Sequence, residues 1–296
     1  MSDKHDVSTP NVVDDPVGNV KSLYAPAARA FVRRDVALTQ TLLEAAFVTL
    51  NTHPPLVDKA HDPMANLRRK WDLLRITLET TVYTSSSSSL AIPTNIPSSD
   101  APIPLKSLPP SLQEVPQLQP QQVTESLLSR SLGLWTPDGC QPSTLYLPVS
   151  IVSALVFAAL RVGCTDVARQ IIETWLAHRS EVASAPNMPG SHLFDLSAES
   201  YEKILDIYCL QVLPRLGEWD YAIEFLKYEP ELSMDKRKVC SIRRVVKWGL
   251  TRRLTIVSIA HLHFPKNLTH SSDDSRRPDL ALTLFVIPLL WRLQPW

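Results

Sequence analysis

Glycine is scarce in this chain, and its scarcity disfavours several kinds of protein. Only 7 of the 296 residues are glycine, whereas 25 are proline. Phosphate-cradling loops and tight β-hairpins use glycine for its freedom to adopt positive backbone angles, so nucleotide-binding loops and β-rich folds are disfavoured. Proline suits the first turn of a helix and linkers without regular structure. We therefore expect a helical protein with long connecting segments.

Motifs of enzymes and metal sites are also missing. The sequence contains no Gly-x-Ser-x-Gly, no His-Glu-x-x-His and no Gly-x-x-x-x-Gly-Lys-Ser/Thr pattern. The one closely spaced pair of histidines, His261 and His263, would supply two ligands, which is too few for a closed zinc site. We expect no catalytic residue, no cofactor, no metal and no small-molecule substrate.

The cysteines and the N-terminus both indicate a reducing compartment. The chain has no Cys-x-x-Cys pair, so we expect free thiols, three of them buried in helices; the four residues are Cys140, Cys164, Cys209 and Cys240. Residues 1–18 are polar and acidic and lack the apolar core of a signal peptide. We expect residues 1–22 to be disordered.

The chain does contain a repeated pattern. Residues 161–172 and 215–226 share Arg-x-Gly-x-x-Asp-x-Ala, followed after two positions by two apolar residues. Glycine ends a helix in the left-handed conformation, aspartate accepts backbone N–H groups where a helix starts, and alanine permits close helix contact. The pattern predicts the turns of two helix–turn–helix units, formed by Gly163, Asp166 and Ala168 and by Gly217, Asp220 and Ala222.

Apolar residues at helical spacing extend this interpretation along the chain. They predict a first helix from Tyr24 to Val32 and, after a break at Arg34, a second helix that ends at Leu50. Further helices are predicted at 64–83, 120–134, 148–162, 166–178, 197–212 and after Gly217. The Pro/Ser-rich residues 84–110 are expected to form a disordered insertion. We predict an all-α fold, with antiparallel helix pairs stacked as a TPR-like α-solenoid over residues 23–250.

One apolar run within this region could be mistaken for a membrane span. Residues 139–160 carry no charge, but Pro148 limits the helix to about fourteen residues, fewer than the ~20 that cross a bilayer. We therefore predict a buried helix here.

The C-terminal part of the chain differs in character from the rest. No acidic residue occurs between Lys236 and Asn267, and we expect a weak basic helix over 235–250. A basic and polar linker, residues 251–279, leads to an apolar tail, residues 280–296, with Leu280, Leu284, Phe285, Ile287, Leu289 and Leu290. The tail has the layout of a membrane anchor but is short for one, so a terminal helix docked on the domain is an alternative. We predict that the basic stretch 236–253 faces solvent or anionic lipid headgroups and does not bind nucleic acid.

Aromatic residues supply the one candidate binding site. We expect Trp71, Trp175 and Trp248 to pack in the core. Trp219 is the exception because it lies in a turn between helices, where an exposed indole can anchor a partner. Together with its neighbours Glu218 and Tyr221 it forms the predicted partner-binding site.

Several of these motifs resemble a known family. They are the turn from Val162 to Asp166, the helix end Ile172-Glu-Thr-Trp175-Leu176 and the helix from Tyr201 that ends Gln211-Val-Leu-Pro-Arg-Leu-Gly217. Residues 28–35 and 42–44 fit the opening helix pair of the same family. Over roughly residues 27–232, outside the insertion, the chain is similar to the tail-anchored peroxins of the peroxin twenty-six type.

The resemblance implies an all-α cytosolic domain without catalytic residues, followed by a C-terminal membrane helix. Such a protein holds a pair of AAA ATPases at the peroxisomal membrane, where they extract the receptor of matrix-protein import. The chain departs from the family in its short apolar tail and throughout residues 236–296. We expect a non-enzymatic adaptor; the alternatives are a helical-repeat scaffold in another pathway and an α-helical enzyme whose site is assembled from distant residues.

Overall fold

The structure of the chain is a computed structural model that describes residues 15–56, 62–87, 108–184, 197–229 and 231–232. These residues form helices and loops, with no strand among them, which confirms the all-α prediction. The helices are α1 (Pro16–Val32), α2 (Val36–Asn51), α3 (Ala65–Ser87), α4 (Pro110–Gln113), α5 (Pro120–Trp135), α6 (Val149–Val162), α7 (Thr165–Ser184), α8 (Ala198–Ile207), α9 (Leu213–Leu216) and α10 (Trp219–Tyr228).

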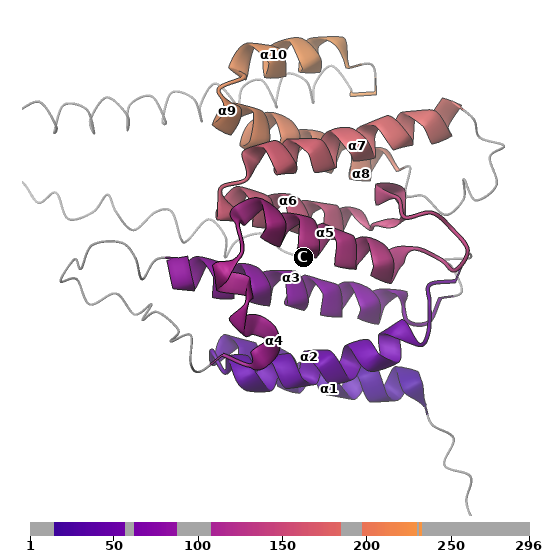
Figure 1. Cartoon of the computed structure of the whole chain (residues 1–296). Helices are drawn as coiled ribbons and strands as arrows, with labels where there is room; N and C mark the ends of the chain where they lie inside the picture. The colour runs from indigo at the N-terminus through magenta and orange to yellow at the C-terminus, as the bar shows by residue number, and fades with distance from the viewer. Residues whose placement is uncertain (1–14, 57–61, 88–107, 185–196, 230, 233–296) are drawn as a thin grey trace, which may run out of the picture. The chain divides into compact units, whose positions relative to one another are not determined.

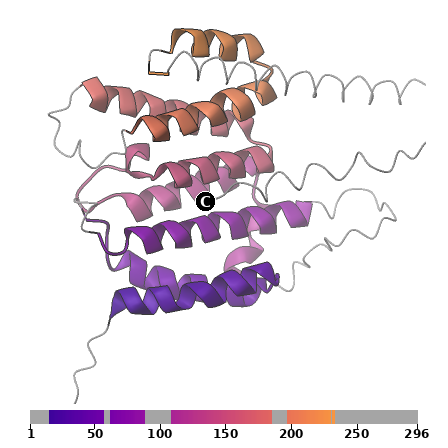
Figure 2. The same cartoon turned by 180° about the vertical axis from the view of Figure 1, so that it is seen from behind.

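Neighbouring helices pack in pairs along the described part of the chain. Helices α1 and α2 contact each other and α3, and α3 in turn packs on α6. Helix α6 also contacts α5, α7 and α8, while α10 rests on α9 (Figures 1 and 2). The predicted helix pairs are therefore present, and α6 stands at the centre of their contacts.

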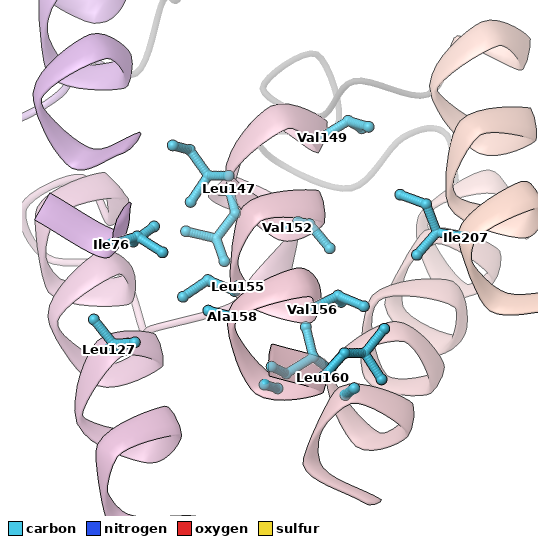
Figure 3. Close-up of a cluster of buried hydrophobic side chains, with 14 of the residues drawn as sticks. Ile76, Leu127, Leu147, Val149, Val152, Leu155, Val156, Ala158, Leu160 and Ile207 are labelled. Carbon is cyan, nitrogen blue, oxygen red and sulfur yellow. The ribbon is translucent and has the colours of Figure 1, made fainter. Parts of the chain in front are cut away.

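Helix α6 is the apolar centre of the core. Leu155 and Ala158 point toward α3 and α5, while Val152 and Val156 point toward Ile207 of α8 (Figure 3). All four of these α6 side chains are at most 4% exposed, and burying one valine or leucine contributes roughly 1.5–3 kcal/mol. Residues 149–160 thus belong to a buried helix, as the sequence predicts. None of the described helices combines the length and apolar character of a membrane span.

Helix α3 also contributes to the core, but it buries charged side chains there. Arg68, Asp72, Arg75 and Glu79 follow one another at intervals of four, three and four residues, and each is at most 8% exposed. This spacing places them in one row along the helix. We call this row the polar seam. Because α3 contacts α1, α2, α5 and α6, even its charged side faces protein.

Asp72 is the best-connected group of the polar seam. Its carboxylate accepts hydrogen bonds from Arg75 Nη2 at 2.5 Å, from Ser131 Oγ at 3.2 Å and from Trp135 Nε1 at 3.0 Å. Arg75 Nη2 also donates to Ser131 Oγ at 3.0 Å. Ser131 and Trp135 belong to α5, so one buried carboxylate fixes how α5 lies against α3.

The two ends of the polar seam are paired as well. Arg68 donates from Nη1 to Asp62 Oδ2 at 2.6 Å and from Nη2 to the carbonyl of His53 at 2.7 Å. Glu79 accepts hydrogen bonds from both terminal nitrogens of Arg130, and the bond from Nη1 is 2.8 Å long. The seam therefore ties α3 to the α2–α3 connection at one end and to α5 at the other.

The repeated pattern forms the turns that the sequence predicts. Gly163 and Gly217 adopt positive φ angles of 94° and 78°. In each turn the residue after the glycine donates its N–H to the carbonyl five residues earlier, at 2.8 Å for Cys164 and 3.0 Å for Glu218. Nothing lies within 4 Å of a Cβ added at either glycine, so only the backbone angle requires glycine there.

A third turn of the same geometry joins α1 to α2. Arg34 has a φ of 61°, and the following Asp35 donates its N–H to the carbonyl of Ala30 at 3.0 Å. Four residues beyond Asp35 lies Thr39, which is fully buried, as Ala168 and Ala222 are in the other two turns. The sequence predicts a break at Arg34, but arginine in place of glycine conceals that this turn matches the other two.

The two aspartates of the repeat do not cap their helices, contrary to the sequence interpretation. The first carbonyl of each helix belongs to the residue directly after the glycine, since Ala168 N–H bonds Cys164 and Ala222 N–H bonds Glu218. Asp166 and Asp220 lie two residues later, in the first turn, where a negative charge still favours the helix dipole. Of these three turns, the one between α1 and α2 has an aspartate cap, because Asp35 Oδ1 accepts from Leu38 N–H at 3.0 Å.

Helix α1 begins earlier than predicted. Residues 16–22 are helical, whereas the sequence indicated disorder through residue 22. Pro16 occupies the first turn, Asp15 accepts from the N–H of Val17 at 3.1 Å, and Val20 is fully buried. One buried residue among polar neighbours gives too weak a periodic signal to reveal this turn.

Both ends of the Pro/Ser-rich segment 84–110 are ordered, which corrects the predicted insertion boundaries. Helix α3 runs to Ser87, with Thr84 and Ser86 donating to the carbonyls of Thr80 and Val82. At the other end Leu108 is buried in the core. The hydroxyl groups of this serine-rich end are therefore satisfied within their own helix.

The chain after α10 is fastened to α7 by an ion pair. Arg179 of α7 donates both terminal nitrogens to Glu231, at 2.7 and 2.8 Å, and its guanidinium lies 4.1 Å from the ring centroid of Tyr201. Leu232 is 3% exposed. Helix α7 extends to Ser184, past the predicted end at His178, because this contact and the buried Val182 keep its last turns packed.

Two of the tryptophans expected in the core are there. Trp71 is fully buried in α3, where its Nε1 donates to the carbonyl of Val20 at 3.3 Å and Tyr24 meets its ring edge-on. Trp175 is 2% exposed in α7. Trp248 lies outside the described residues.

The described cysteines are free thiols, as expected, but they are less buried than predicted. Cys209 is buried, whereas Cys140 and Cys164 are only half-buried, and Cys140 lies in a loop. Burial raises the pKa of the Cys164 thiol, which keeps it protonated and weakly nucleophilic near neutral pH. Cys240 lies outside the described residues.

Candidate protein-binding site

The predicted partner-binding residues gather where α10 begins. Glu218 caps the helix, Trp219 opens it, and Tyr221 lies in its first turn. Tyr221 is 43% exposed, while Trp219 and Glu218 are half-buried, so the indole is less accessible than its place in a turn indicates. We call these three residues the turn patch.

Arg169 of α7 holds the turn patch in place. It donates from Nη1 to Glu218 Oε1 at 2.6 Å and from Nε to Glu173 Oε1 at 2.7 Å, and its guanidinium lies 5.8 Å from the ring centroid of Tyr221. The hydrogen bonds to Glu173 and Glu218 raise the pKa of Arg169, so it stays charged at any physiological pH. One side chain therefore ties α7 to both the cap and the first turn of α10.

A tyrosine beneath the patch completes this connection. Tyr208 donates its hydroxyl to Glu173 Oε1 at 2.6 Å. Burial and this hydrogen bond raise the pKa of Tyr208, so the phenol remains a donor near neutral pH. Glu173 thus accepts from Arg169 and Tyr208 together, which joins the patch to the segment that follows α8.

Phe225 packs against Tyr221 and connects it to Tyr208. Phe225 meets the ring of Tyr208 edge-on, with 5.8 Å between centroids, and lies 6.2 Å from Tyr221 at a tilt of 42°. The three rings form a column from the core to the surface. A ring held from beneath and from the side loses little conformational entropy when a partner covers it.

Tyr208 begins a π turn, η7 (Tyr208–Val212), that joins α8 to α9. Leu213 N–H bonds the carbonyl of Tyr208, five residues back. The next residue is Pro214, which has no N–H and whose ring crowds the carbonyl four residues earlier, so a wider turn relieves the clash. This local widening positions the phenol of Tyr208 under the patch.

The sequence indicated the three residues of the turn patch but not the contacts that support them. Arg169 and Glu218 are 49 residues apart, and Tyr208 and Glu173 are 35 apart. No local pattern signals such pairings. Pro214 was the one available hint, because a proline inside an apolar helical run indicates irregular geometry near Tyr208.

The described residues offer no clear metal or cofactor site. No group of three or more His, Cys, Asp or Glu among them is placed to hold a metal ion. One surface depression of about 270 Å³ lies on α10, and another of about 330 Å³ lies beside Trp135 and Tyr146. Both are open hollows.

Several sequence predictions concern residues outside the described part of the chain. They include the basic stretch 236–253, the histidine pair at 261 and 263, and the linker 251–279. The apolar tail 280–296 lies there too, with Leu280, Leu284, Phe285, Ile287, Leu289 and Leu290.

Comparison of the chain with protein-family models, with curated proteins and with solved structures found no match. The functional argument therefore depends on the residues and on their geometry.

Proposed function

We propose that the protein is a non-enzymatic adaptor that binds another protein through the turn patch. The observation that carries the proposal is the fixed position of Tyr221, an exposed aromatic side chain held by Arg169 and Phe225. Aromatic residues beside a charged pair are typical of the few side chains that dominate protein interfaces. No motif for catalysis competes with this interpretation.

The resemblance to the peroxin twenty-six type names the partner. On this proposal the turn patch binds the peroxisomal pair of AAA ATPases, and the apolar tail 280–296 fixes the protein to the peroxisomal membrane. The motifs that carry the resemblance include the turn from Val162 to Asp166 and the segment Tyr201 to Gly217, which contains Tyr208 and ends beside the patch.

We further propose that the helix pairs are stacked as a TPR-like solenoid. Three turns of one geometry, at Arg34, Gly163 and Gly217, support this arrangement. In such a fold each unit contacts mainly its neighbours, and binding uses surfaces formed by successive turns.

A binding measurement with two substitutions at one position tests the site. Tyr221→Ala is expected to weaken capture of the purified ATPase pair by about 30-fold, the effect of losing a dominant interface side chain. Tyr221→Phe keeps the ring over Arg169 and should stay within about threefold of the wild type. Titration of the full-length chain by surface plasmon resonance gives both values.

Val48→Ala is the matched control, since Val48 is an exposed apolar residue, 68% accessible, on α2. It should leave the affinity unchanged. Equal losses for Val48→Ala and Tyr221→Ala would contradict the turn patch as the binding site, and wild-type protein that captures neither ATPase would contradict the proposed partner.

Cell imaging tests the location. With an N-terminal fluorescent tag, the chain should overlap a peroxisomal marker, and deleting residues 279–296 should make the signal diffuse. Diffuse signal from the intact tail would contradict the membrane role and leave the scaffold in another pathway as the better interpretation.

A further inference from the structure

The side of α10 that faces away from the core carries a mixture of acidic and apolar side chains. The helix buries Ala222 and Leu226, while Ile223 is 49% and Tyr228 is 68% exposed. The surface depression of about 270 Å³ on this side is lined by five residues, which we call the outer face: Asp220, Ile223, Glu224, Lys227 and Tyr228.

The order of these side chains defines what the outer face can bind. Asp220 and Glu224 are four residues apart and lie in one row along α10. At 100° per residue, Ile223 and Tyr228 fall on opposite flanks of that row. A helix with a basic row beside an apolar stripe would complement this surface in charge and in hydrophobicity.

The chain itself contains such a sequence just beyond the described residues. Residues 236–247 include six basic residues and no acidic one. Read as a helix, Val239, Ile242 and Val246 form an apolar stripe at spacing i, i+3, i+7. The row beside that stripe is basic and contains Lys236, Arg243 and Lys247.

We propose that residues 236–247 bind the outer face of α10 in the same chain, as an amphipathic helix. The apolar stripe covers Ile223, and the basic row lies along Asp220 and Glu224. Lys227 borders the acidic row and repels a basic side chain beside Ile223, so it helps to fix the register of the added helix. The proposal concerns residues outside the turn patch and does not rest on the proposed function.

The short connection favours binding within one chain. Only three residues separate Leu232, which is buried, from Lys236. A tether of this length keeps the basic segment at an effective concentration in the millimolar range, so modest contacts suffice. A separate partner, or a lipid surface, must compete against that concentration.

Cysteine cross-linking in the full-length chain tests the contact. In the Lys227→Cys variant, a short bismaleimide should join the introduced thiol on α10 to the native Cys240, and the yield should not depend on protein concentration. Peptide mass spectrometry identifies the linked pair. Val48→Cys, on the exposed surface of α2, is the control and should give no link to Cys240.

Charge reversal then tests the ionic complement. Adding Asp220→Lys and Glu224→Lys to the cross-linking variant should lower the yield about fivefold, and a further Lys236→Glu, Arg243→Glu and Lys247→Glu should restore it. Glu181→Lys with Glu199→Lys makes the same change in net charge elsewhere and should leave the yield unchanged. Circular dichroism checks that each variant keeps its helix content.

Three results would overturn the proposal. They are the absence of a cross-link between positions 227 and 240, a cross-link that forms only between chains, and a cross-linking yield that does not change when the charges of Asp220 and Glu224 are reversed. Binding of residues 236–247 to anionic vesicles without that link would assign the segment to a membrane surface instead.

Discussion

Helices α3 and α6 contact each other at the middle of the domain, yet they are built from different residues. Helix α6 presents valine, leucine, isoleucine and alanine to its neighbours, whereas α3 buries two arginines, an aspartate and a glutamate beside its apolar residues. Apolar side chains tolerate small shifts of a partner helix, because their attraction has no direction. A buried carboxylate with three donors does not tolerate such shifts.

The difference indicates a division of tasks between the two helices. Helix α6 provides an apolar surface on which α3, α5, α7 and α8 pack, and the polar seam of α3 fixes which face of α5 meets it. Buried ion pairs add little net stability but penalise incorrect arrangements, since any slip leaves a charge unpaired. The predictions below test this comparison from the largest expected effect to the smallest.

Removing one partner of the polar seam should have the largest effect. In Asp72→Ala, the buried Arg75 loses its counter-ion and the buried Trp135 N–H loses its acceptor, so the free energy of unfolding should fall by about 3–5 kcal/mol. Urea denaturation followed by circular dichroism measures the loss. Asp138→Ala, at an exposed loop position, is the control and should change stability by less than about 0.5 kcal/mol.

A double substitution separates stability from specificity. Asp72→Leu with Arg75→Met removes both charges and keeps similar volume, so it should recover more than half of the loss caused by Asp72→Ala. If the double variant is as unstable as the single one, the polar seam contributes stability directly, and the division of tasks is wrong.

Truncating a buried side chain of α6 should lower the free energy of unfolding somewhat less than Asp72→Ala does. Leu155→Ala leaves a cavity among α3, α5 and α6 and should lower the free energy of unfolding by about 2–4 kcal/mol. Leu38→Ala, at a side chain that is 47% exposed, should cost less than about 1 kcal/mol in the same denaturation experiment. Equal costs at the two positions would contradict a central role for α6.

The turns allow the same comparison at the scale of one residue. Gly163→Ala should lower the unfolding free energy by about 1 kcal/mol, because alanine is strained at a φ of 94°. Arg34→Gly should raise it by about 0.5–1 kcal/mol, since glycine relieves that strain in the α1–α2 turn. Thermal melts of both variants should therefore move in opposite directions.

Local features of the fold could be predicted from the sequence, and long-range ones could not. Gly163 and Gly217 allow their turns to be predicted, because few residues other than glycine adopt positive φ. Arg34 also has a positive φ, but the residue type does not indicate it, because the surrounding turn imposes the angle. The capping role assigned to Asp166 and Asp220 was wrong by two positions, since the glycine turn already determines which carbonyl begins the helix.

The polar seam and the support of the turn patch escaped prediction for one shared reason. Asp72 is buried by Ser131 and Trp135, and Tyr221 is held by Arg169, all of them distant in sequence. A charged row at helical spacing usually faces solvent, so the intervals between Arg68 and Glu79 give no sign that this row is buried. Its burial follows from the packing of α5 and the other neighbouring helices on α3.

The ion pair between Arg179 and Glu231 has a mechanical consequence. Because Glu231 is paired with Arg179 of α7 and Leu232 is buried, a pull applied beyond Leu232 acts first on these two contacts. Helix α10 precedes them in the chain and is loaded only after they break. The turn patch can therefore keep its geometry while the C-terminal side of the protein is under strain.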